Sequence, residues 1–162
     1  RSEGQPSVRK LFTDARPAFE GICAQLAPLP MIVMGRSLGS ACAAELCRAI
    51  PDALAGVIFE SGFSDVSDFA ARRALPPSIV TSADLDIIDP LRKLAGCQAP
   101  LLVLHGELDQ LIAASEGIAA YEASGARDKR LVLVPRRGHN DLSLSEVYWD
   151  ALSAFVASVA RG

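Results

Sequence analysis

Four short apolar runs, separated by segments with helical periodicity, constrain the fold of this chain more than any other feature. Each run is rich in valine, isoleucine and leucine and shows little alternation between apolar and polar residues. Continuous runs of this kind are typical of strands that are covered on both faces, as in a parallel sheet. The sequence therefore predicts strands at residues 31–34, 56–59, 101–104 and 131–134.

Helical patterns fill most of the chain between these runs. We expect the first helix to begin after Ser7, whose hydroxyl can cap it, and to end near residue 26, ahead of Pro28 and Pro30. Further helices are predicted over residues 41–49, 113–123 and 145–160. Strands that alternate with helices predict an α/β fold, with a mostly parallel sheet covered by helices on both faces.

The length of the chain, 162 residues, predicts a single domain over residues 1–162. Half of the residues are hydrophobic, as in a globular protein with a substantial core. Residues 63–94 interrupt the rhythm of strands and helices with a short helical stretch at 66–75 and the pair Pro76 and Pro77. Long insertions of this kind often face a substrate. We therefore predict a lid-like insertion over residues 63–94.

Composition narrows the possible partners. The net charge of −3 and the absence of a basic stripe argue against nucleic-acid binding, and no apolar run is long enough to cross a bilayer. Neither a zinc-binding cluster nor a phosphate-binding glycine loop is present, so no metal or cofactor is expected. The four cysteines have no CxxC spacing and are expected to be reduced, structural residues of a cytoplasmic protein. They are Cys23, Cys42, Cys47 and Cys97.

The segment GRSLG, residues 35–39, places one serine where a predicted strand meets a predicted helix. A sharp turn at Ser37 would expose its hydroxyl beyond the carboxyl end of the strand, at the cost of a strained backbone. Both Gly35 and Gly39 are expected because a Cβ atom at either position would collide with the neighbouring strand or helix. The free N–H groups of the helix, with that of Leu38 among them, would then point at a developing oxyanion.

A nucleophilic serine requires a base and a group that orients the base. His139 follows the last predicted strand and Asp109 follows the one before it, so both are expected at the same edge of the sheet as Ser37. The alternative base is His105, which we expect to stabilise its own loop. The alternative acid is Asp141, which lies on the same loop as His139, two residues away, and is less well placed to orient the imidazole ring.

Together these motifs resemble the α/β-hydrolase superfamily, in particular bacterial serine hydrolases related to the ABHD12/13/17-type and BEM46-like proteins. The chain order of serine, acid and histidine is the one these hydrolases use. The resemblance is carried by SEGQPS at 2–7, GRSLGS at 35–40, ESGF at 60–63, PLLVLHGELD at 100–109 and GHND at 138–141. It covers nearly the whole chain.

The resemblance implies a serine hydrolase of small-molecule carboxylic esters or thioesters that forms an acyl-enzyme. Ser37 would be the nucleophile, His139 the general base, Asp109 the orienting acid and the Leu38 N–H an oxyanion donor. It also implies that the chain corresponds to the C-terminal two-thirds of a hydrolase, without the earlier strands and the loop that supplies a second oxyanion donor. Two alternatives stay open: a non-catalytic binding module on the same scaffold, and a serine peptidase.

Overall fold

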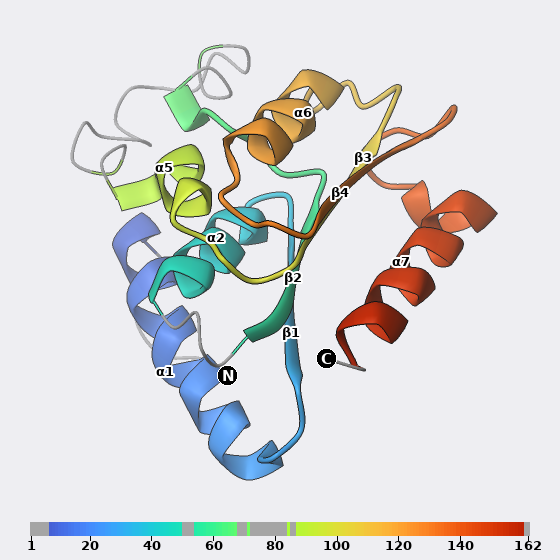
Figure 1. The fold of residues 1–162 in the computed structure, drawn as a ribbon. Coiled ribbons are helices and arrows are strands. Elements are labelled where there is room, and N and C mark those ends of the chain that lie inside the picture. Colours follow the sequence, from blue (N-terminus) through green and yellow to red (C-terminus); the bar gives the residue numbers. More distant parts are fainter. Residues whose placement is uncertain (1–6, 50–53, 68–70, 72–83, 85–86, 161–162) are drawn as a thin grey trace.

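A four-stranded, all-parallel sheet forms the centre of the computed structural model, which describes residues 7–49, 54–67, 71, 84 and 87–160 (Figure 1). The strands run in the order β1-β2-β3-β4, with each paired to the next in the chain. They are β1 (Met31–Arg36), β2 (Leu54–Glu60), β3 (Leu101–Gly106) and β4 (Lys129–Val134). All four predicted strands and the predicted α/β fold class are confirmed.

Helices cover both faces of this sheet, as the alternating pattern predicts (Figure 1). On one face lie α1 (Val8–Leu26), α2 (Gly39–Ala49), α5 (Pro90–Ala95) and α6 (Ala114–Ala123). On the other face lies α7 (Glu146–Val159), preceded by a short 3-10 helix at Leu142–Leu144. Helix α5 was not predicted from the sequence, although Asp89 caps it and Pro90 occupies its first turn, a pairing typical of helix starts.

The core consists of two apolar layers, one on each side of the sheet. Val57, Phe59 and Val103 pack toward the helices α2, α5 and α6, whereas Leu102 and Leu104 pack toward α7. The four residues of β3 from 101 to 104 are completely buried. Burial on both faces explains why the strands appear in the sequence as continuous apolar runs.

Most of the predicted insertion at 63–94, and most of the helical stretch predicted at 66–75, lies outside the described residues. At the start of the insertion, Phe63 is buried in a third apolar cluster that includes Phe12 of α1 and Ala41 of α2. Glu116 of α6 holds this beginning, because its carboxylate accepts hydrogen bonds from the backbone N–H (2.8 Å) and the hydroxyl (2.5 Å) of Ser64. The lid-like role of the insertion stays a prediction.

Two of the four cysteines form a disulfide. Cys47, in α2, is bonded to Cys97, just after α5, with a distance of 5.3 Å between their Cα atoms, and both residues are completely buried. The prediction that all four cysteines are reduced is wrong for this pair. The partners are 50 residues apart in the sequence and meet only because α2 packs against α5, so no local spacing reveals them. Cys23 and Cys42 are free thiols.

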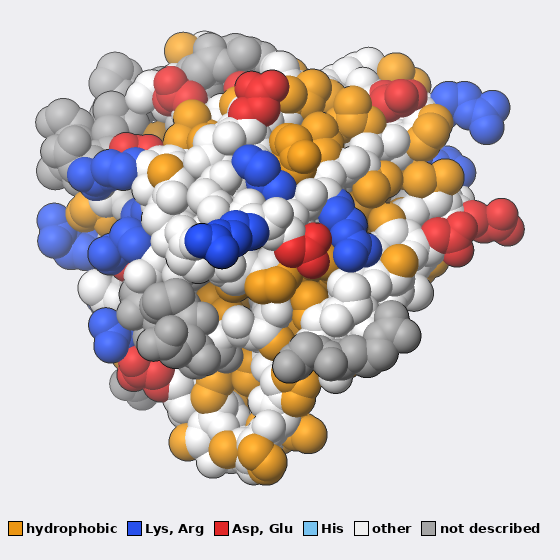
Figure 2. All heavy atoms as spheres, viewed as in Figure 1, with side chains coloured by type: hydrophobic (Ala, Val, Ile, Leu, Met, Phe, Trp, Pro, Cys, Tyr) orange, Lys and Arg blue, Asp and Glu red, His pale blue; other side chains and the backbone are white. Residues whose placement is uncertain are grey.

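The molecular surface is mixed in character on the face shown in Figure 2. Basic and acidic side chains are interspersed there with apolar ones. Large apolar side chains that stay exposed include Leu29, Leu144 and Trp149. Within the described part of the chain, no helix combines the length and the apolar content needed to span a membrane.

Candidate active site

Ser37 lies on the turn between β1 and α2, with a positive φ of 52°. Its N–H donates a hydrogen bond to the backbone carbonyl of Glu60 (3.0 Å), and its own carbonyl accepts one from the N–H of Ser40 (3.0 Å). A non-glycine residue in this left-handed region costs on the order of 1–3 kcal/mol, so the surrounding structure has to impose it. The two hydrogen bonds hold the turn from both sides and keep the serine at the carboxyl end of β1.

The two glycines that flank this turn are not equivalent. A Cβ atom on Gly35 would lie 2.5 Å from the carbonyl oxygen of Gly39 and 2.7 Å from the Cα of Ser40. A Cβ atom on Gly39 would meet nothing within 4 Å. The prediction of a steric requirement therefore holds for Gly35 and is wrong for Gly39. At Gly39, the first residue of α2, a Cβ atom would point into open space.

We expect Gly35→Ala to lower the free energy of unfolding by about 3 kcal/mol, because the new methyl group meets backbone atoms that cannot rotate away. Gly39→Ala is the matched control and should leave stability unchanged or raise it by up to about 1 kcal/mol. Urea unfolding of both variants measures the difference. Equal losses of stability in the two variants would contradict the steric argument at Gly35.

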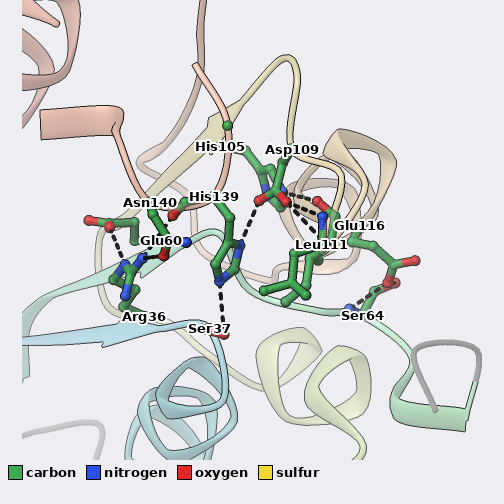
Figure 3. Close-up of polar contacts among 12 residues, drawn as sticks. Arg36, Ser37, Glu60, Ser64, His105, Asp109, Leu111, Glu116, His139 and Asn140 are labelled. Atoms are coloured by element: carbon green, nitrogen blue, oxygen red, sulfur yellow. Dashed lines mark hydrogen bonds and ion pairs between the residues drawn. The ribbon is translucent and has the colours of Figure 1, made fainter. Parts of the chain in front are cut away.

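His139 connects the serine to an acid across the carboxyl end of the sheet (Figure 3). Its Nε2 atom lies 3.1 Å from the Ser37 hydroxyl oxygen, and its Nδ1 atom lies 2.8 Å from Oδ2 of Asp109. The imidazole is almost entirely buried, with 7% of the side chain exposed. When Nδ1–H donates to the carboxylate, Nε2 is left as an acceptor that faces the hydroxyl.

Asp109 is held by the loop that follows β3. Its side chain is completely buried, and its Oδ1 atom accepts hydrogen bonds from the backbone N–H groups of Leu111 and Ile112, both at 2.8 Å. These two donors compensate the buried charge on one oxygen, while the other oxygen faces the imidazole of His139 at 2.8 Å, with Nε2 of His105 farther away at 3.4 Å. The carboxylate is thereby fixed before it contacts the ring.

The two alternative residues make other contacts. The buried imidazole of His105 lies with Nε2 at 2.9 Å from the carbonyl oxygen of Ile112 and 3.4 Å from Oδ2 of Asp109, within the loop where it was predicted to act. Asp141 turns back on its own loop and accepts the backbone N–H of Gly138 at 2.6 Å. Of the two candidate acids, the structure therefore places Asp109 against the imidazole of His139.

Leu38 follows the serine directly and immediately precedes α2, so its N–H belongs to the group of free donors at the start of that helix. Its side chain is exposed beside the turn. The oxyanion role of this N–H stays a prediction. Among the described residues, no group of three or more His, Cys, Asp or Glu side chains could hold a metal ion.

A network of hydrogen bonds and one ion pair, not predicted from the sequence, lies beside this site. The Arg36 guanidinium donates from Nη2 to the backbone carbonyl of His139 (2.8 Å) and to Oδ1 of Asn140 (2.7 Å). Its Nε atom lies 3.1 Å from Oε1 of Glu60, whose other oxygen accepts the hydroxyl of Tyr148 at 2.8 Å. The available signal was the pair of opposite charges at the ends of two neighbouring strands, Arg36 and Glu60, which are partners in the register of β1 and β2.

No protein-family model matches the chain. Among curated proteins, it is 29% identical over 157 residues to "Alpha/beta hydrolase domain-containing protein aho-3" of Caenorhabditis elegans. It is 28% identical over 158 residues to "Alpha/beta hydrolase domain-containing protein 17C" of Homo sapiens, and 27% identical over 167 residues to "Protein bem46" of Schizosaccharomyces pombe. These alignments cover 96–97% of this chain and 45%, 46% and 54% of the relatives. The chain thus spans about half the length of these curated relatives.

Solved structures with a similar arrangement include an esterase domain from a Rhodothermus marinus protein, with a TM-score of 0.68 and 18% identity over 91% of this chain and 67% of that one. An acetyl xylan esterase from Paenibacillus sp. R4 has a TM-score of 0.73 and 16% identity over 92% of this chain and 52% of that one. Identities this low show a shared fold and carry no statement about substrate.

Proposed function

We propose that this chain, which has an α/β-hydrolase fold and is similar in sequence to alpha/beta hydrolase domain-containing proteins, is a serine hydrolase of small-molecule carboxylic esters or thioesters. The observation that carries the proposal is the continuous line of contacts from Asp109 through His139 to Ser37. A nucleophile, a base and an orienting acid lie in hydrogen-bonding order at the carboxyl ends of parallel strands, where ligands bind in open α/β sheets.

In the proposed reaction, the Ser37 hydroxyl attacks the acyl carbon while Nε2 of His139 takes its proton. The negative charge on the tetrahedral intermediate is stabilised by the N–H of Leu38 at the start of α2. The protonated imidazole then gives its proton to the departing alcohol or thiol, which leaves an acyl group on the serine. A water molecule, deprotonated by the same imidazole, then attacks the acyl carbon; the bond to the serine oxygen breaks, the acid leaves, and the imidazole returns the proton to Ser37. Asp109 keeps the ring in the required tautomer throughout.

The surroundings of the site favour an uncharged acyl group. Leu38 and Leu108 directly neighbour Ser37 and Asp109 in the sequence, and they are 54% and 60% exposed. The exposed side chain of Leu38, directly after the serine, supplies apolar surface that an acyl chain can bury. The sequence also predicts an apolar lining for the site from Phe69, Leu75, Ile79 and Val80 of the insertion, which lie outside the described residues.

A fluorophosphonate probe tests the proposal directly, because it reacts with an activated serine and does not require turnover. Labelling reports the reactivity of the serine itself, so it does not depend on the choice of ester substrate. We expect labelling of the native sequence and none of Ser37→Ala.

Ser40→Ala is the matched control, since Ser40 is a completely buried serine of α2 whose hydroxyl has no hydrogen-bond partner among the described residues. Labelling should persist in this variant. A folded protein that the probe does not label would instead favour the non-catalytic binding module. If the probe labels Ser37 but aminoacyl amides are cleaved faster than short-chain nitrophenyl esters, the chain is a peptidase.

A further inference from the structure

We propose that Arg36 is a positioning residue that holds the base of the site, His139, at the correct distance from the nucleophile. The inference rests on the proposed function and extends it to the residue next to the serine in the sequence. Arg36 does not contact the imidazole ring itself. It acts through the backbone carbonyl of His139 and the side chain of Asn140 (Figure 3).

The guanidinium of Arg36 joins two separate parts of the site. The backbone of Arg36 forms the last position of β1, directly before Ser37. Its side chain reaches the loop that carries His139, which we call the histidine loop. Nη2 uses its two N–H groups for two acceptors on that loop, at 2.8 and 2.7 Å, while Nε faces Glu60. A planar group with donors in fixed directions sets the position of its acceptors more strictly than a point charge does.

The orientation of the Arg36 guanidinium is itself set by two buried side chains, Glu60 and Tyr148. Glu60 is 5% exposed and lies opposite Arg36 in the register of the two strands, so its carboxylate has little access to water. Its second oxygen accepts the hydroxyl of Tyr148, which is buried as well. Burial and the contact with Glu60 raise the pKa of Tyr148 to about 12, so this hydroxyl stays protonated and continues to donate. The guanidinium is therefore held in one orientation although its side chain is partly exposed.

The remaining contacts of the histidine loop explain why this tether matters. The backbone of Arg137 accepts the N–H of Leu108, and the backbone N–H of Arg136 lies 3.3 Å from the Glu107 carboxylate. Both contacts tie the loop to the residues that carry the acid. Arg36 ties the loop to the strand that carries the serine. It therefore governs the 3.1 Å separation between the Ser37 oxygen and Nε2 of His139, and an error of about 1 Å in such a geometry can cost about a hundredfold in rate.

The test compares Arg36→Met with Arg137→Met. Arg137 also donates from a guanidinium to a backbone carbonyl of this region, that of Leu144 at 2.8 Å, but its side chain faces Leu144 and Asp141 and not His139. We expect Arg36→Met to lower kcat for a nitrophenyl ester by about 10- to 100-fold with KM changed by less than about threefold. Arg137→Met should keep kcat within about threefold. Arg36→Lys should fall between the native protein and Arg36→Met, since an ammonium cannot reproduce the planar set of contacts.

A second readout does not depend on catalysis. The His139 Nδ1 proton, deshielded by its hydrogen bond with Asp109 and protected from solvent exchange by burial, should give a distinct downfield proton resonance in the native chain and in Arg137→Met. We expect exchange to broaden or abolish it in Arg36→Met. If the native chain neither reacts with the fluorophosphonate nor cleaves esters, the proposed function fails, and this resonance still tests the positioning role.

Retention of both kcat and the resonance in Arg36→Met would overturn the inference, as would equal losses in Arg36→Met and Arg137→Met. If Arg36→Met does not fold, Asn140→Ala takes its place, because Asn140 is exposed and its loss removes one acceptor without burying a charge. That variant should lose about threefold to tenfold in kcat and shift the His139 resonance. No change in either measurement would overturn the inference.

Discussion

His139→Gln is expected to reduce ester turnover by about 10⁴-fold or more while the melting temperature changes by only a few degrees. A glutamine amide can still donate to Asp109, so the loop keeps its contact. It cannot take a proton from the Ser37 hydroxyl, whose oxygen lies 3.1 Å from Nε2 of His139 in the native protein. Initial rates with a nitrophenyl ester, together with thermal unfolding of the same samples, measure the two effects.

The other histidine of the chain provides the contrast. His105 is completely buried, with its Nε2 atom 2.9 Å from the Ile112 carbonyl oxygen. We therefore expect His105→Gln mainly to lower the melting temperature. A large loss of stability in His139→Gln with activity retained would mean that His139 is a structural residue, and the proposed mechanism would be wrong.

Asp109→Asn should lower turnover by about 10⁴-fold, the second of the two largest effects. The asparagine oxygen can still accept the N–H groups of Leu111 and Ile112, which keeps the loop folded. Its NH₂ group then faces Nδ1 of His139 and favours the tautomer in which Nε2 carries the proton. In that tautomer Nε2 cannot accept a proton from the serine. Steady-state kinetics and urea unfolding separate the chemical loss from any loss of stability.

Asp141→Asn is the matched control for this substitution. Asp141 accepts the N–H of Gly138, and an asparagine oxygen can accept it equally well. We expect turnover within about tenfold of the native protein. A mild effect of Asp109→Asn combined with a severe effect of Asp141→Asn would transfer the orienting role to Asp141.

The sheet and most helices are predictable from the sequence because strands buried on both faces are apolar at every position, Leu101 to Leu104 being the clearest case. Strand ends are less predictable. β1 extends through Gly35 and Arg36, and β4 begins at Lys129, since backbone pairing continues into residues that hydropathy assigns to loops. With six residues, α5 is too short to show a helical period.

The juxtaposition of Ser37, Asp109 and His139 follows from topology alone, since each comes after a parallel strand and all such strands end at the same edge of the sheet. Side-chain contacts between distant segments are harder to predict. Arg36 and Glu60 are each typical of a solvated strand end, and their pairing becomes visible only once the register of β1 and β2 is known. The disulfide between Cys47 and Cys97 depends on helix packing in the same way.

The hydrogen bond from the Ser37 N–H to the Glu60 carbonyl has a kinetic consequence for assembly of the molecule. A slip of one position between β1 and β2 would move this partner by about 3.3 Å and turn alternate side chains to the opposite face. The Ser37 hydroxyl therefore cannot reach its final place until these two strands have aligned. During refolding, the moment at which the serine becomes reactive should mark the completion of that alignment.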